Sequence, residues 1–135
     1  MRSEILLNSH EVARLPWRPF ADGQGVHDRL LWQDPEGASY VGLLYMEPGT
    51  SVAPHLHHGT VHHLWVVSGE CTINARTLGA GSYVFVPQGL EHAIQQAGPT
   101  GCMLFYLYLR VAPVPSGCRR VPSGHEAVPL DVLGV

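Results

Sequence analysis

Short apolar stretches separated by turn residues fill the chain from residue 26 to residue 111. Glycine, proline, serine and aspartate recur between them, and no long segment repeats apolar residues at the spacing of a helix face. This pattern predicts an all-β domain of strands joined by tight turns, built as an antiparallel sandwich or barrel. The expected strands cover residues 26–33, 40–47, 51–57, 61–67, 71–76, 83–86, 92–96 and 103–111. The expected turns between them include residues 68–70, 78–81 and 98–101.

The two ends of the 135-residue chain lack this pattern. Near the start, residues 11–15 predict a single turn of helix that Pro16 stops, and a loop rich in proline and glycine follows. The end is rich in proline and glycine, and no regular structure is expected there. The sequence therefore predicts one domain with an N-terminal arm (1–26), a β-barrel (27–111) and a C-terminal tail (112–135).

Several expected strands are apolar on both faces, as in residues 64–67 and 83–86. A half-solvated sheet would alternate apolar with polar residues, so the outer face of these strands needs a cover. A second sheet of the same chain or a partner subunit would provide one, and only 14% of the residues are charged. We therefore predict a homodimer, with outward-facing aromatic residues such as Trp65, Tyr83 or Phe85 at or near the interface.

Charge and cysteine content narrow the possible partners. The formal net charge is −3, which argues against nucleic-acid binding because that function needs a basic face. The longest strongly apolar run, residues 103–109, is too short to span a membrane, and no signal peptide is apparent. The odd set of Cys71, Cys102 and Cys118 has no CxxC spacing and fits a reducing compartment. We expect a cytoplasmic protein with neither nucleic acid nor membrane as a partner.

Four histidines are placed so that they converge on one point of the barrel. His55 and His57 are two residues apart on an expected strand, so both side chains point the same way. After the turn at residues 58–60 the next strand returns alongside, and His62 can face the same interior, while His92 would close the set from a neighbouring strand. Imidazole nitrogens bind a divalent metal at about 2.0–2.1 Å, so the four predict a metal site. The other five histidines lack this placement: His10, His27, His58, His63 and His125.

The spacing of these residues also resembles a known family. Residues 49–69 follow the pattern Gly-(x5)-His-x-His-(x4)-His-(x6)-Gly, which is similar to the first motif of the cupins. Residues 81–96 follow Gly-(x5)-Pro-x-Gly-(x2)-His-(x3)-Gln, which is similar to the second. The resemblance covers roughly residues 17–111, most closely to anti-sigma-factor metal domains and small dioxygenases. It implies a single-domain jelly-roll barrel with one metal ion per chain.

Two positions depart from the cupin pattern. His62 stands where the family usually has glutamate, and Gln96 stands where it usually has asparagine. An all-histidine set is neutral and leaves the ion its full positive charge, which suits Fe(II), Zn, Ni or Cu better than Mn or Mg. The resemblance favours Fe(II). Because the pattern varies at His62, we expect that ligand to be the most easily lost.

The pocket beside the metal is predicted from strand parity. Its expected apolar lining comes from the strands that carry the histidines, although core packing explains these side chains equally well: Leu64, Val66, Val84, Val86 and Ile94. Tyr106 or Tyr108 would contribute from the last strand, and the amide of Gln96 would face the pocket or support a ligand. No carboxylate stands out as a general base, since Glu91 is expected to point away from the metal.

The resemblance implies a non-haem metal dioxygenase that acts on a small chelating carbonyl or hydroxy acid, with the metal polarising the deprotonated substrate. One alternative is a metal-dependent isomerase or lyase that uses the ion only as a Lewis acid. Another is a metal- or ligand-binding sensor module without catalysis. Oxygen consumption by an Fe(II)-loaded sample separates the first from the other two.

Overall fold

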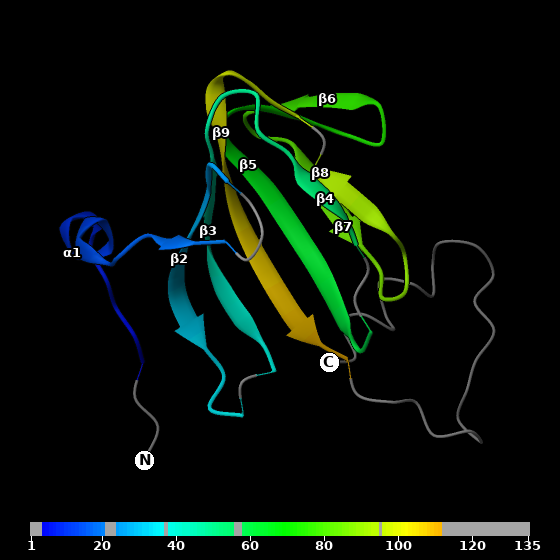
Figure 1. Ribbon diagram of the computed structural model, residues 1–135. Helices are drawn as coiled ribbons and strands as arrows, with labels where there is room; N and C mark the ends of the chain where they lie inside the picture. The colour runs from blue at the N-terminus through cyan, green and yellow to red at the C-terminus, as the bar shows by residue number, and fades with distance from the viewer. Residues whose placement is uncertain (1–3, 21–23, 37, 56–57, 95, 112–135) are drawn as a thin grey trace, which may run out of the picture.

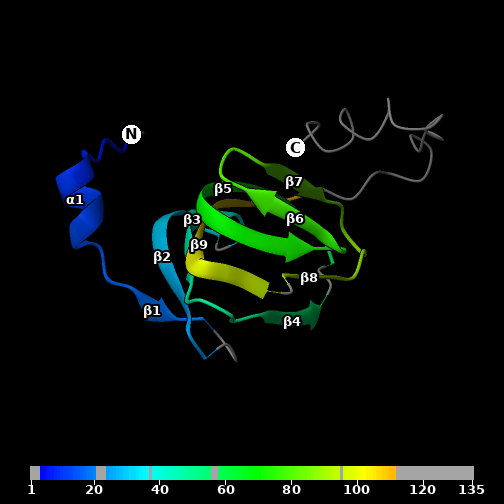
Figure 2. The same ribbon diagram turned by 90° about the horizontal axis from the view of Figure 1, so that it is seen from above.

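Two antiparallel sheets enclose the interior of the molecule (Figure 1). The computed structural model describes residues 4–20, 24–36, 38–55, 58–94 and 96–111. The larger sheet has the order β1-β2-β3-β9-β5-β6, and β7 pairs with β5. Its strands are β1 (Arg18–Pro19), β2 (Val26–Gln33), β3 (Tyr40–Met46), β5 (Thr60–Ile73), β6 (Arg76–Gly79), β7 (Tyr83–Val86) and β9 (Gln96–Arg110). The smaller sheet is β4 (Val52–His55) with β8 (His92–Ile94), and it closes the side that the larger sheet leaves open (Figure 2). The antiparallel β-barrel predicted from the sequence is confirmed.

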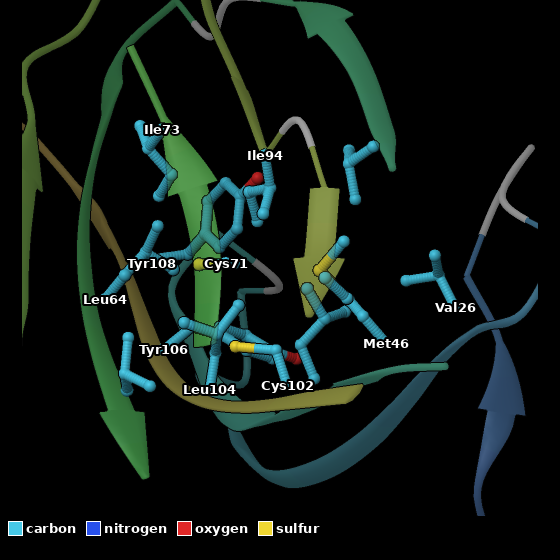
Figure 3. Packing of buried hydrophobic residues seen from close by; sticks show 14 residues of the cluster. Val26, Met46, Leu64, Cys71, Ile73, Ile94, Cys102, Leu104, Tyr106 and Tyr108 are labelled. Carbon is cyan, nitrogen blue, oxygen red and sulfur yellow. The ribbon is translucent and has the colours of Figure 1, made fainter. Parts of the chain in front are cut away.

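Alternate residues of the central strands fill the barrel. In β9 the even-numbered residues from Cys102 to Tyr108 are buried, and the odd-numbered residues between them are only half-buried. β5 runs beside β9, with Val66 opposite Leu104 and Leu64 opposite Tyr106. Figure 3 shows the resulting cluster, in which the rings of Tyr106 and Tyr108 lie among apolar side chains. Full burial of each aliphatic side chain stabilises the fold by about 1.5–3 kcal/mol.

The turn predicted at residues 68–70 is wrong, because β5 continues through it to Ile73. Register shifts on both sides of Gly69 mark a β-bulge, and Gly69 has a φ of 73°. A Cβ atom there would overlap the carbonyl oxygen of Gly101 on β9. The chain reverses instead at Asn74 and Ala75, whose φ values of 48° and 63° are those of a tight hairpin turn. Glycine therefore bends the strand here and does not end it.

The turn predicted at residues 98–101 is also wrong, since these residues belong to β9. Gly101 has a φ of 83° and faces Gly69, so both long strands bend at the same level. The strand predicted at residues 71–76 ends at Ile73, and β6 occupies part of the turn predicted at residues 78–81. The errors at residues 68–70 and 98–101 have the same cause: a glycine that permits a bend between paired strands has the local sequence of a turn. The other two errors follow from the reversal at Asn74 and Ala75.

The N-terminal arm joins the barrel through β1. Helix α1 (Ser9–Arg14) begins with a capping box, in which the Asn8 side chain accepts from the Glu11 amide, and this confirms the predicted helical turn. β1 then pairs with β2, with Arg18 opposite Asp28, so the arm contributes a strand to the larger sheet. No described helix is long and apolar enough to cross a membrane. The predicted tail, residues 112–135, lies outside the described residues.

The outer face of β5 and β7 carries an aromatic cluster made of His63, Trp65, Tyr83 and Phe85. The ring centroids of Trp65 and Tyr83 are 6.0 Å apart, and 51% of each residue is exposed. His63 Nδ1 lies 2.6 Å from the Tyr83 hydroxyl oxygen, and the His63 ring packs 5.2 Å from that of Phe85. About half of the Trp65 and Tyr83 surface thus remains open in the described structure.

We expect a homodimer with this outer aromatic cluster at or near the interface, because association would remove its apolar surface from water. Light scattering at micromolar concentration should give twice the mass of the chain. Trp65→Glu would place a charge in the interface and shift the mass toward that of a monomer. Trp32→Glu is the control, since Trp32 is 40% exposed on β2, away from the cluster. A monomeric wild-type protein at this concentration would refute the prediction.

Candidate metal centre

Three of the four predicted histidine ligands meet inside the barrel. His55 on β4 and His92 on β8 lie directly opposite each other, with ring centroids 4.3 Å apart. His62 on β5 has its ring centroid 5.1 Å from that of His92. The larger and the smaller sheet therefore contribute to one cluster. His57 lies outside the described residues.

Backbone carbonyl groups orient two of these rings. Nδ1 of His55 lies 2.8 Å from the carbonyl oxygen of Ala53, and Nδ1 of His92 lies 3.4 Å from that of Leu90. A carbonyl oxygen can only accept a hydrogen bond, so each Nδ1 carries the proton and donates it. The lone pair is then on Nε2, which is the nitrogen left to bind a metal ion.

Burial favours the neutral form of His92. His62 and His92 are 4% and 5% exposed, and the ring of Tyr108 packs edge-to-face on that of His62. Burial lowers the pKa of His92, and the nearby His55 lowers it further, against the opposing effect of the bond to the Leu90 carbonyl. A neutral imidazole can bind a metal ion and an imidazolium cannot, so this environment suits a ligand.

The spacing of the three rings fits a shared ion. With a metal–nitrogen bond of about 2.0–2.1 Å, two imidazoles at right angles or at the tetrahedral angle have centroids about 4.5–5.2 Å apart. The observed separations of 4.3 and 5.1 Å are close to this range. Among the described residues, however, no three His, Cys, Asp or Glu side chains already form a complete metal-binding group. The three histidines are a partial set that fits a metal ion in donor chemistry and proximity.

The histidines open onto a cavity of about 330 Å³ between the two sheets. Its described lining combines the three histidines, three tyrosines, one carboxylate and five apolar residues: His55, His62, His92, Tyr40, Tyr106, Tyr108, Asp28, Phe20, Leu44, Val52, Leu64 and Ile94. Of the pocket residues expected from parity, Leu64, Ile94, Tyr106 and Tyr108 are therefore in place. The exposed Glu91 is not among the described lining residues.

Gln96 and Val84 are placed differently from the prediction. Gln96 is exposed and lines a separate hollow beside Cys71 and Gly98. β8 ends at Ile94 and β9 begins at Gln96, so the strand parity counted from His92 does not carry over to Gln96. Val84 packs against the buried core and is absent from the described lining of the cavity, as are the buried Val66 and Val86.

Tyr106 reaches the carboxylate of Asp28 across strand β3. Its hydroxyl donates to Oδ1 of Asp28 at 2.5 Å. The β3 residue opposite Tyr106 is Gly42, and a Cβ atom at Gly42 would lie 2.5 Å from the Tyr106 hydroxyl oxygen. The missing side chain therefore gives the tyrosine ring room to lie over β3. On its other side, Asp28 Oδ2 accepts from Arg18 Nη2 at 3.2 Å.

The cavity tyrosines are held in their neutral form. Burial raises the pKa of Tyr106, and the hydrogen bond to Asp28 raises it further. Burial also raises the pKa of Tyr40, with a further contribution from the negative charge of Asp28. The pKa of Tyr108 is raised by burial and by Tyr40. At neutral pH all three hydroxyl groups can therefore donate hydrogen bonds to a ligand or a neighbour.

The sequence pattern missed five residues of this wall: Phe20, Asp28, Tyr40, Leu44 and Val52. Phe20 belongs to the arm, and its amide donates to the Val26 carbonyl, which folds it back over the barrel. Asp28 lies on the same face of β2 as the buried Val26, and that inward parity of a carboxylate was the available signal. Tyr40 stacks on Tyr108, its partner on β9, at 4.7 Å.

The sequence profile described as the ChrR cupin-like domain matches residues 8–112. The chain belongs to the ChrR-like cupins. The match includes most of the arm as well as the barrel, and it confirms the cupin resemblance of the two histidine motifs. No curated protein matches this cupin.

Solved structures support the same fold for this ChrR-like cupin. A predicted oxalate decarboxylase of Thermotoga maritima has a TM-score of 0.65 at 20% identity, over 73% of this chain and 96% of that one. A chain of the Rhodobacter sphaeroides SigE complex with the anti-sigma ChrR has a TM-score of 0.60 at 25% identity, over 71% of this chain and 49% of that one. The polyketide cyclase RemF of Streptomyces resistomycificus has a TM-score of 0.64 at 17% identity, over 84% of this chain and 88% of that one. The expected jelly roll is thereby confirmed.

Proposed function

We propose that this cupin binds one divalent transition metal, with Fe(II) favoured, and acts as a non-haem dioxygenase on a small chelating carbonyl or hydroxy acid. One observation carries the proposal: three histidine rings meet on the wall of a largely apolar cavity. His55, His62 and His92 would hold the ion together with His57. The chemistry that such an ion supplies is Lewis-acid polarisation of the substrate and electron transfer with dioxygen.

The chain's own residues prepare the cavity for that chemistry. The carbonyl oxygens of Ala53 and Leu90 fix two histidine tautomers, so that Nε2 is the nitrogen available to the ion. Leu64 and Ile94, each 5% exposed, exclude water from the inner wall. A neutral ligand set does not offset the charge of the ion, which favours binding of a deprotonated chelating substrate.

Oxygen uptake tests the proposal. The protein loaded anaerobically with Fe(II) is expected to consume dioxygen when a chelating diketone or hydroxycarbonyl is added, and the Zn(II)-loaded protein is expected not to do so. The Zn(II) sample is the control for metal-independent oxidation, because Zn(II) has no redox chemistry. Conversion of the carbonyl by the Zn(II) form would instead indicate an isomerase or lyase. Absence of oxygen uptake with every chelating carbonyl and metal would contradict the dioxygenase.

A sensor module is the second candidate, favoured by the match to the ChrR cupin-like domain. A structure of SigE with the anti-sigma ChrR is among those similar to this chain, so we expect a protein partner for this cupin also. This chain covers 49% of the matched chain. Tight metal and ligand binding with no conversion of any ligand would favour this function over catalysis.

A further inference from the structure

The cavity has an uneven distribution of charge. Its described lining contains the carboxylate of Asp28 and no arginine or lysine. Arg18 pairs with Asp28 but is itself not among the described lining residues, and its side chain is 55% exposed against 16% for Asp28. The arginine therefore meets the carboxylate from the solvent side. Toward the cavity, Asp28 presents negative charge and hydrogen-bond acceptors in a poorly hydrated space.

The position of Asp28 in the cavity wall is firmly set. Its β2 strand pairs with β3 on one side and with β1 on the other, so the backbone of Asp28 is held from both directions. Its two carboxylate oxygens accept from Tyr106 and Arg18, at 2.5 and 3.2 Å. Each oxygen has a further lone pair and can accept another hydrogen bond. The carboxylate is thus a fixed acceptor, and its orientation does not depend on a ligand.

Together with the proposed metal site, this geometry defines two ends of the cavity. A chelating group would occupy the end at His55, His62 and His92, and the rest of the ligand would extend past Tyr106 toward Asp28. A hydroxyl or other donor at that position would bond to Asp28. A second carboxylate would be repelled by it, and no described lysine or arginine of the lining would compensate.

We propose that Asp28 is a specificity-determining residue, and that the substrate is a chelating hydroxycarbonyl whose far end carries a hydrogen-bond donor and no second negative charge. The inference rests on the proposed function, because the metal would bind the chelating end of the substrate. If Asp28 has this role, dicarboxylates should be poor substrates, because their second carboxylate would face Asp28. The likeness to a predicted oxalate decarboxylase consequently does not extend to the substrate.

Four related 4-pyranones test the inference by binding alone. Kojic acid, allomaltol, comenic acid and methyl comenate share the chelating hydroxyketone and differ at the far carbon, which carries CH2OH, CH3, a carboxylate or its methyl ester. Calorimetric titration of the Zn(II)-loaded protein at neutral pH reads affinity without turnover. We expect kojic acid to bind about tenfold more tightly than comenic acid, with allomaltol between them, because a charge-assisted hydrogen bond is replaced by like-charge repulsion. The methyl ester removes the charge but offers no hydrogen-bond donor, so it should bind more tightly than comenic acid and about as tightly as allomaltol.

Two variants assign the effect to Asp28. In Asp28→Asn the difference between kojic and comenic acid is expected to shrink to about twofold or less, since the negative charge is gone. Glu36→Gln is the matched control, because it removes one carboxylate from a side chain that is 77% exposed outside the cavity, and it should keep the wild-type order. Should Asp28→Asn fail to fold, the comparison of comenic acid with its methyl ester on the wild-type protein still tests the charge.

The outcomes separate the inference from the proposed function. If none of the four pyranones binds the Zn(II)-loaded protein, the chelating metal site is refuted, and the inference falls with it. If all four bind equally, or if comenic acid binds most tightly, the chelating site stands and only the role of Asp28 is overturned. An unchanged order of affinities in Asp28→Asn would also overturn that role.

Discussion

Replacing His92 with alanine is expected to remove nearly all tightly bound metal from the protein. His92 is 5% exposed, and its ring lies beside those of both His55 and His62, so its loss would break the centre of the cluster. In metalloproteins generally, loss of a residue that hydrogen-bonds to a metal ligand lowers metal affinity about 10- to 100-fold, and loss of the ligand itself should have a larger effect. Elemental analysis of the purified variant and a competition titration with a chelator measure the effect. His57→Ala is expected to behave in the same way.

His63→Ala is the matched control for these variants. His63 is adjacent to His62 on β5 but belongs to the outer aromatic cluster, where its Nδ1 lies 2.6 Å from the Tyr83 hydroxyl. The metal content of His63→Ala should equal that of the wild type. An unchanged metal content in His92→Ala would reject the assigned site. We expect His62→Ala to retain more metal than His55→Ala or His92→Ala, since the cupin pattern varies at position 62. An equal loss of metal in the three variants would show that His62 contributes as much to metal binding as His55 and His92 do.

Gly69→Ala is expected to lower the free energy of unfolding by about 3 kcal/mol or more. Gly69 has a φ of 73°, and the added methyl group would overlap the backbone oxygen of Gly101, which a rotamer change cannot move. Urea denaturation followed by tryptophan fluorescence measures the change. Gly81→Ala separates the two causes, because Gly81 has a φ of 89° but open space around its Cβ position. In that control the free energy of unfolding should fall by only about 1 kcal/mol, which is the cost of the left-handed conformation alone. Equal losses in the two variants would show that the close approach of the strands is unimportant.

The strands were predictable because burial alternates along them, and the errors fall at glycines. Gly69 and Gly101 have the local signal of turns, yet each lies in a strand of more than ten residues. Their role is visible only when the neighbouring strands are in place, because Gly69 makes room for β9 and Gly101 makes room for Tyr45 and Met46 on β3. A single sequence does not show which strands are neighbours. A bend shared by two strands is therefore indistinguishable from two separate turns.

The candidate site was predictable to the extent that it depends on parity within one strand. His55, His62 and His92 come together as expected, and so do Leu64, Tyr106 and Tyr108. Asp28 was missed because its position in the site depends on three strands at once. Tyr106 on β9 reaches it only through the space left by Gly42 on β3, and the sequence separation of Asp28 and Tyr106 is 78 residues. No local pattern contains that relation.

The participation of the arm in the cavity wall has a consequence for how this protein could be altered. Phe20 and Asp28 line the cavity, and Arg18 supports Asp28 from outside, whereas the candidate metal ligands His55, His62 and His92 come later in the sequence. Asp28, which would select the substrate, thus precedes in the sequence every histidine that would hold the ion. A hybrid that takes residues 1–30 from a related cupin could acquire a new preference and keep its metal centre. Recognition and reactivity can in this way change independently.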